Sequence, residues 1–222
     1  AEGTNVGNIV FTPIGYKDIE GTGTATYWYT LSEVRGNLGG ISYSNQKYYM
    51  KVVVSDLGEG ELSTAVTYHE SPDSEAIDIS KVKFVNNYTT TEALVTLEAN
   101  KILNGRDLQS EEFDFVVVDV NNTPVAYGDN VSGAKTGDEA TIKFSTIAYN
   151  LSDLGGQNQK VFEYVMYEIA PPTNQNGIVF DRTKFKVKVT VKDNQDGTLS
   201  TTVVYCDENG QEILKDGNPV TP

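Results

Sequence analysis

The sequence has very few residues of the kinds that build disulfides, metal clusters and catalytic centres. One cysteine, Cys206, and one histidine, His69, occur in 222 residues. An internal disulfide and a metal site made of several cysteines or histidines are therefore excluded. No Gly-x-Ser-x-Gly motif and no phosphate-cradling glycine motif occurs either. We expect no metal, no cofactor and no turnover enzyme, and the fold needs a source of stability other than disulfides.

Basic residues and long apolar runs are also scarce. Seventeen lysines and arginines face 31 acidic residues, which gives a net charge of −14. Such a surface repels phosphate backbones and anionic lipid, so nucleic-acid binding is not expected. No run approaches the roughly 18 apolar residues that span a bilayer. The first thirty residues lack the basic start and apolar stretch of a secretion signal. We expect no membrane insertion of this segment.

Short stretches of alternating apolar and polar residues recur along the whole chain, separated by clusters of Gly, Asn and Asp. They are rich in β-branched and aromatic residues, which is typical of half-buried strands. No long window keeps a helical period. The sequence predicts an all-β protein built of sandwiches or small barrels, without the crossover helices of a parallel sheet. The expected strands are Ile9–Ile14, Ala25–Leu31, Tyr48–Val54, Leu62–Tyr68, Leu94–Leu103, Phe113–Val118, Thr141–Ile147, Phe162–Ile169, Phe185–Val191 and Leu199–Tyr205.

An internal repeat sets the expected number of domains. Three segments of the first half match three segments of the second half in the same order, with spacings of 133, 135 and 137 residues. Ordered matches with small insertions indicate duplicated domains. The matched pairs are Ile9–Tyr16 with Ile142–Tyr149, Tyr29–Glu33 with Tyr164–Glu168, and Gly40–Asp56 with Gly177–Asp193.

The two copies differ at their ends. The first copy runs on to Phe84–Tyr88, for which the second has no counterpart. The second copy begins with two extra strands, which the first lacks. We therefore predict two tandem immunoglobulin-like β-sandwich domains, each truncated at one chain end. Residues 1–88 form the first domain without its opening strands, and residues 89–222 form the second without its last strand.

Several motifs resemble those of one protein family. They are Ala99–Leu108, Glu112–Phe115, the Tyr-x-x-x-Glu strands that end at Glu33 and Glu168, Gly177–Asp181, the turn Asp193–Gly197, and Phe84-x-Asn86-x-Tyr88. In this order they resemble the streptococcal pilin isopeptide-linkage domain of Gram-positive backbone pilins and related wall-anchored proteins. The resemblance covers nearly the whole chain.

The resemblance implies a role for four residues. In such domains a lysine on the first strand joins an asparagine on the last strand through a self-formed amide, assisted by a glutamate on a middle strand. By position, Lys101 is the amine donor of the second domain and Glu168 its assisting acid. Glu33 is the assisting acid of the first domain, and Asn86 its carboxamide.

Elementary chemistry supports such a bond. Burial favours the neutral forms of lysine and glutamate, which makes an amine nucleophile and a proton donor available together. Folding holds the reacting groups in place, for which effective molarities near 10⁵ M are plausible. Each domain would react once, on itself, and so would resist unravelling under tension.

Neither domain contains all three residues. Lys101 has no Phe-x-Asn-x-Tyr segment in its own domain, and Asn86 has no first-strand lysine. Lys17, Asn209 and Asn218 lie among turn residues and are poor substitutes. Either the complementary strands belong to a longer parent protein, or neighbouring molecules supply them across exposed sheet edges.

Simpler interpretations stay open from sequence alone. Lys101 could be a solvated strand residue, Glu33 and Glu168 could be surface carboxylates at strand ends, and Asn86 could serve a turn. The oxygen-rich segment Asp193–Gly197 suits a hairpin better than a calcium loop, because it lacks the later bidentate glutamate.

The resemblance implies a structural subunit or stalk of a Gram-positive surface pilus or adhesin, located outside the cell at the cell wall. Its partners would be other copies of the same pilin, neighbouring surface-protein domains and, in the full-length parent, a sortase. The alternative is an adhesin module that binds a host protein or glycan through loops such as Asp119–Asp138.

Overall fold

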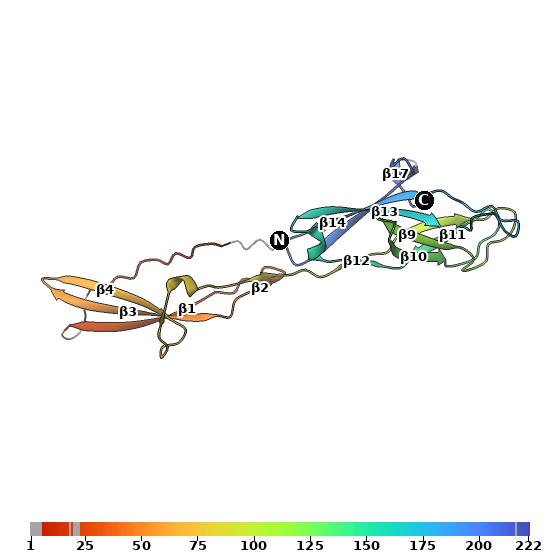
Figure 1. Cartoon of the computed structure of the whole chain (residues 1–222). Helices are drawn as coiled ribbons and strands as arrows, with labels where there is room; N and C mark the ends of the chain where they lie inside the picture. The colour runs from red at the N-terminus through yellow and green to blue at the C-terminus, as the bar shows by residue number, and fades with distance from the viewer. Residues whose placement is uncertain (1–5, 18, 20–22, 216) are drawn as a thin grey trace. The chain divides into compact units, whose positions relative to one another are not determined.

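The computed structural model describes residues 6–17, 19, 23–215 and 217–222. The chain divides into two compact units, an N-terminal unit that ends at Thr89 and a C-terminal unit from Thr90 to Pro222. The described residues form strands and two short 3₁₀ turns, without an α-helix (Figure 1). The predicted all-β fold with tandem units is confirmed. Among these residues, no helix has the length and apolar character that crossing a membrane requires.

The N-terminal unit is built on one four-stranded antiparallel sheet with strand order β1-β3-β4-β5. Its long strands follow the alternating pattern of the sequence, and Val52 and Val54 of β3 point to the buried face. A second, small sheet pairs β2 with β6. The elements are β1 (Thr24–Ser32), β2 (Ile41–Ser42), β3 (Lys47–Gly58), β4 (Glu61–His69), β5 (Ala76–Ile77), the 3₁₀ turn η1 (Ile79–Lys81) and β6 (Asn87–Tyr88).

The C-terminal unit contains a seven-stranded sheet with strand order β15-β14-β13-β9-β10-β11-β8, in which all neighbours are antiparallel. Two small sheets pair β7 with β12 and β16 with β17. The elements are β7 (Ala93–Val95), β8 (Glu98–Ile102), β9 (Asp114–Asp119), β10 (Pro124–Asn130), β11 (Glu139–Phe144), β12 (Ile147–Tyr149), η2 (Leu151–Leu154), β13 (Gln159–Glu168), β14 (Phe185–Asp193), β15 (Leu199–Cys206), β16 (Leu214–Lys215) and β17 (Asn218–Pro219).

The seven-stranded sheet curls so that its two edge strands approach each other. The backbone N–H of Glu98 on β8 donates a hydrogen bond of 3.0 Å to the hydroxyl of Tyr205 on β15. The side chains that point inward make one apolar core, in which Val187, Val189 and Val191 of β14 are completely buried. The curled sheet therefore forms the two layers of a sandwich-like fold.

The internal repeat reappears as repeated contacts. In the N-terminal unit the ring of Tyr16 lies 5.0 Å from that of Tyr27, and its hydroxyl is 2.8 Å from the hydroxyl of Tyr29. In the C-terminal unit Tyr149 makes the same contacts with Phe162 (4.9 Å) and Tyr164 (2.9 Å). Matched sequence positions thus occupy matched structural positions.

The prediction of a strand at Ile9–Ile14 is wrong. These residues have no strand structure, and Ile9 and Phe11 are 61% and 62% exposed. The matching Ile142 and Phe144 lie in β11, between β8 and β10, and are 1% and 3% exposed. The described part of the N-terminal unit has no counterparts of β8 and β10, so its matching segment has no strands to pair with.

The expectation of a loop over Asp119–Asp138 is also wrong, because strand β10 occupies its centre and pairs on both sides. Two expected strands are in addition divided. Leu94–Leu103 forms β7 and β8, and Thr141–Ile147 contributes to β11 and β12. The remaining expected strands are confirmed within a few residues at their ends.

Candidate functional site

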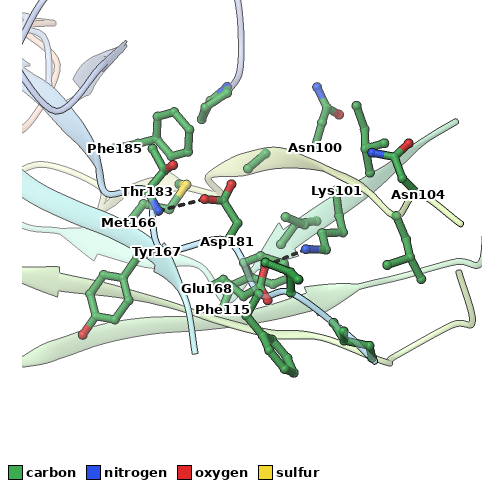
Figure 2. Close-up of a pocket in the computed structure, with 18 of the residues that line it drawn as sticks. Asn100, Lys101, Asn104, Phe115, Met166, Tyr167, Glu168, Asp181, Thr183 and Phe185 are labelled. Atoms are coloured by element: carbon green, nitrogen blue, oxygen red, sulfur yellow. Dashed lines mark hydrogen bonds and ion pairs between the residues drawn. The ribbon is translucent and has the colours of Figure 1, made fainter. Parts of the chain in front are cut away.

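Lys101 and Glu168 form a buried ion pair in the C-terminal unit. Lys101 lies on β8, where Ala99 and Lys101 point to the buried face. Glu168 is the last residue of β13 and follows the inward positions of that strand. The two side chains are 8% and 7% exposed, and Lys101 Nζ lies 2.6 Å from Glu168 Oε2 (Figure 2). The interpretations of Lys101 as a solvated residue and Glu168 as a surface carboxylate are therefore wrong.

The surroundings of the pair are apolar on one side. Lys101 Nζ stands 4.2 Å from the ring centroid of Phe113, a distance at which an ammonium group is attracted to the ring face. Burial raises the pKa of Glu168, and the negative charge of Asp181 raises it further, against the opposing hydrogen bond and charge of Lys101. Glu168 Oε1 is buried, and no hydrogen bond from the described residues reaches it. A buried acceptor gains stability from a hydrogen-bond donor, so this oxygen is the atom of the site to which a further donor would bind.

Asp181 brings a second carboxylate to the site. Its Oδ1 accepts a hydrogen bond of 2.8 Å from the backbone N–H of Thr183. Desolvation alone would raise the pKa of Asp181, but the hydrogen bonds from Thr183 and the attraction of Lys101 outweigh it and lower the pKa. Asp181 is thus an exposed anion whose charge acts on both Lys101 and Glu168.

A pocket of about 830 Å³ opens beside β8, and Lys101, Glu168 and Asp181 line it (Figure 2). Its wall continues along β8 from Ala99 to Ile102 and includes Pro222. The backbone N–H of Asn100 donates a hydrogen bond of 2.7 Å to the carbonyl of Pro222. Pro222 thus contacts β8 at Asn100, and the pocket continues past it along the chain. We call this space the lysine pocket.

Glu33 and Asn86 form the corresponding pair in the N-terminal unit. Glu33 directly follows β1, and Asn86 directly precedes β6. Asn86 Nδ2 donates a hydrogen bond of 2.6 Å to Glu33 Oε1. The backbone N–H of Ser44 donates to Asn86 Oδ1 at 2.8 Å and to Glu33 Oε2 at 3.0 Å. Glu33 is half-buried and Asn86 is exposed.

The structure thus brings together two of the predicted residues in each unit. Glu33 meets Asn86 across 53 residues of sequence, and Lys101 meets Glu168 across 67. Lys101 and Asn86 belong to different units. Sequence reasoning missed the contribution of Ser44 and Asp181. The repeat held a signal for both, because they are matched positions, 137 residues apart.

The other chemically notable residues have ordinary structural partners. His69 bonds to the Thr67 hydroxyl at 2.9 Å and to the Ser74 carbonyl at 2.8 Å. Cys206 is a buried free thiol. The segment Asp193–Gly197 lies at the turn that joins β14 to β15. In the described part of the chain, no group of His, Cys, Asp and Glu side chains is arranged to hold a metal ion.

Each of the two antiparallel β units has a glutamate at the end of a strand. The glutamate pairs with a lysine in the C-terminal unit and with an asparagine in the N-terminal unit. Such paired polar residues at strand ends define a class of structural β domain. The family model described as "FctA: Spy0128-like isopeptide containing domain" matches residues 1–89 and 97–215. The chain belongs to this family of pilin-type structural domains, which are components of Gram-positive surface pili. None of the curated proteins compared with the chain is similar enough to count as a relative.

Proposed function

We propose that the chain is a load-bearing segment of a Gram-positive surface pilus, in which each completed domain closes a Lys–Asn isopeptide bond with the help of its glutamate. Lys101 and Glu168 are the amine and the assisting acid of the C-terminal domain. Glu33 and Asn86 are the assisting acid and the carboxamide of the N-terminal domain. The partners are other pilin subunits, and a sortase would join the full-length parent into fibres.

One observation carries the proposal: the two sites complement each other. Glu33 and Glu168 are matched positions, 135 residues apart. One oxygen of Glu33 accepts the carboxamide N–H of Asn86. One oxygen of Glu168 accepts a hydrogen bond from Lys101, while the other is buried and has no hydrogen-bond partner among the described residues. Placing an asparagine carboxamide at that free oxygen gives a complete Lys–Glu–Asn site.

The strand that would supply this asparagine could lie along the lysine pocket, beside β8. In the N-terminal unit the ring of Phe84, two residues before Asn86, packs edge-on against Tyr48 at 5.6 Å. The position that matches Tyr48 is Phe185, which lines the lysine pocket. A strand laid beside β8 next to Pro222, with its phenylalanine against Phe185, would bring its asparagine to Lys101 and Glu168.

The reaction balances with the groups present. Lys101 first gives a proton to Glu168 and becomes a neutral amine. Its Nζ then attacks the asparagine Cγ, the new Nζ–Cγ bond forms and the Cγ–Nδ2 bond breaks. Of the two protons that Nζ loses in all, one leaves with Nδ2 as ammonia and one stays on Glu168. A raised pKa of Glu168 suits this end state, in which its carboxyl group is neutral.

The bond would connect the first strand of a domain to its last. A crosslink that closes a loop of about 100 residues stabilises a fold by ~4 to 5 kcal/mol on the disulfide analogy. Its greater effect is mechanical, because a covalent tie between the terminal strands blocks extension of the chain between them. A domain that reacts once on itself has no turnover and is not an enzyme.

The alternative of a binding loop at Asp119–Asp138 has no comparable support. Strand β10 occupies the centre of that segment and is paired on both sides. We therefore place the function in the strand interface and not in a loop.

A peptide supplies the test. A synthetic peptide with the sequence of Ser80–Tyr88 carries the Phe-x-Asn-x-Tyr segment of the N-terminal unit. On incubation with the chain, we expect the intact mass to rise by the mass of the peptide minus one ammonia, with the crosslink mapped to Lys101.

The variant Lys101→Ala and a peptide with Asn86→Ala should give no adduct. A peptide with Asn87→Ala should react, which identifies Asn86 as the reacting residue. Saturating binding of the peptide without any change in covalent mass would refute the proposal.

A further inference from the structure

The backbone N–H of Ser44 points at the atoms that would react. It donates to the carboxamide oxygen of Asn86 at 2.8 Å and to one oxygen of Glu33 at 3.0 Å. These contacts fix the orientation of the carboxamide, because a backbone N–H can donate only to its oxygen and not to its NH₂ group. The NH₂ group then faces the other oxygen of Glu33, at 2.6 Å.

In this orientation the carboxamide oxygen contacts the Ser44 N–H and the carboxamide nitrogen contacts Glu33. Negative charge develops on Oδ1 when an amine attacks Cγ, and a fixed donor 2.7–3.1 Å from that oxygen stabilises the transition state. The Ser44 N–H is such a donor. The glutamate contacts the nitrogen that leaves, where it can deliver the proton for ammonia.

The C-terminal unit repeats a local hydrogen bond that Ser44 makes in the N-terminal unit. The Ser44 hydroxyl accepts a hydrogen bond of 3.2 Å from the backbone N–H of Gln46, two residues on. At the matched position the Asp181 carboxylate accepts one of 2.8 Å from the backbone N–H of Thr183, again two residues on. Both residues therefore make the same local turn, and Asp181 lines the lysine pocket next to Glu168.

We propose that the backbone N–H of Ser44, and that of Asp181 in the C-terminal unit, are the oxyanion donors of isopeptide formation, while the glutamate serves the nitrogen atoms. The inference rests on the proposed function. It assigns stabilisation of the oxyanion to a main-chain amide and not to a side chain. The side chains of Ser44 and Asp181 hold the turn, and the catalytic group is the main-chain amide.

The ligation of the Ser80–Tyr88 peptide tests this assignment. Asp181→Pro removes the N–H, whereas Asp181→Ala and Asp181→Ser keep it and alter only the side chain. We expect Asp181→Pro to lower the first-order rate constant of the bound peptide by roughly 10²- to 10³-fold, the effect of losing one oxyanion donor. Asp181→Ser, whose hydroxyl can keep the turn, should stay within about tenfold of the parent chain. Asp181→Ala loses the side chain that holds the turn and should react more slowly than Asp181→Ser but faster than Asp181→Pro. The dissociation constant of the peptide should change little in all three.

Two further measurements keep the test decisive. Protection of the Cys206 thiol, which is 2% exposed in the folded unit, reports whether the proline variant folds. If it does not fold, replacing the amide of residue 181 by an ester through semisynthesis removes the N–H alone and should give the same loss of rate. A folded proline variant, or an ester variant, that reacts as fast as Asp181→Ala overturns the oxyanion assignment while the proposed function stands. Absence of any adduct with the unaltered chain overturns both.

Discussion

The two units contain matched segments that end in opposite environments. Ile9 and Phe11 are mostly exposed, whereas Ile142 and Phe144 are among the most buried residues of the chain. The apolar pattern is the same, and the difference lies in the neighbours, because β8 and β10 flank the second segment. An alternating sequence thus indicates which side chains can be buried. Whether they are buried depends on the presence of neighbouring strands.

The two glutamates differ in the same way. Glu168 sits inside the curled sheet against Lys101, and burial raises its pKa. Glu33 is half-buried and bonded to the exposed Asn86. In the C-terminal unit, the strand that carries the lysine, β8, also helps to bury the glutamate.

The largest expected contrast concerns the matched phenylalanines. Phe144→Ala should destabilise the C-terminal unit by about 3–5 kcal/mol, because it removes a buried aromatic ring. Phe11→Ala should change the stability of the N-terminal unit by less than about 0.5 kcal/mol. Urea unfolding can follow each unit separately, by thiol labelling of Cys206 for the C-terminal unit and by fluorescence of Trp28, the single tryptophan, for the N-terminal unit. Equal losses in the two units would remove the contrast.

A second contrast separates Glu168 from a glutamate on the other face of the same strand. Glu168→Gln removes the proton acceptor of the lysine pocket and should slow peptide ligation by roughly 10²- to 10⁴-fold. Glu163→Gln alters an exposed residue of β13 and should leave the rate unchanged. Time courses of intact mass measure both rates. A Glu168→Gln chain that ligates at the parent rate would show that the carboxylate takes no part in proton transfer.

The sequence predicted those features that depend on local pattern or on the repeat. Strands β3, β14 and β15 alternate strongly, and each was found within a few residues of its expected position. The pairing of Lys101 with Glu168 followed from the family resemblance, and their burial agrees with the matched places of the two glutamates.

The features that were missed depend on tertiary structure. Strand β10 carries Pro124 and Gly128, residues typical of turns, yet Gly128 is needed because a Cβ there would lie 2.6 Å from the Lys143 carbonyl of β11. The donor at Ser44 was missed for a different reason. Every residue except proline has a backbone N–H, so the residue type did not single out Ser44, and only its matched position in the repeat pointed to it.

A smaller contrast is expected between the matched tyrosine pairs. Tyr149 and Tyr164 are buried, so Tyr149→Phe leaves the Tyr164 hydroxyl without its partner and should cost about 1–2 kcal/mol. Tyr16→Phe should cost less, because Tyr16 and Tyr29 are half-exposed and water can replace the lost hydroxyl. The same two probes, Cys206 labelling and Trp28 fluorescence, measure these losses. A larger loss for Tyr16→Phe would mean that the N-terminal pair is closed to water in solution.

The protonation of Glu168 also enters the stability of the fold. Its folded pKa is raised above the unfolded value, so the carboxyl group favours the folded state most when it is protonated. This contribution is complete below the unfolded pKa of about 4.3 and is lost as the pH rises through the folded pKa. Ligation has the opposite dependence, because a protonated Glu168 cannot accept a proton from the Lys101 ammonium.

The smallest expected effect is a shift in the pH profile of ligation. It follows from a substitution that makes the C-terminal site resemble the N-terminal one. The ligation rate should fall as the pH drops through the pKa of Glu168, at a midpoint above the ordinary glutamate value of about 4.3. Asp181→Ser installs the residue of the matched position and keeps the turn. It removes a negative charge that raises the pKa of Glu168, so the midpoint should move to lower pH. Glu163→Gln removes a charge outside the lysine pocket and should leave the midpoint in place. A midpoint that moves equally in both variants would show that net charge, and not the neighbouring carboxylate, sets the proton affinity of Glu168.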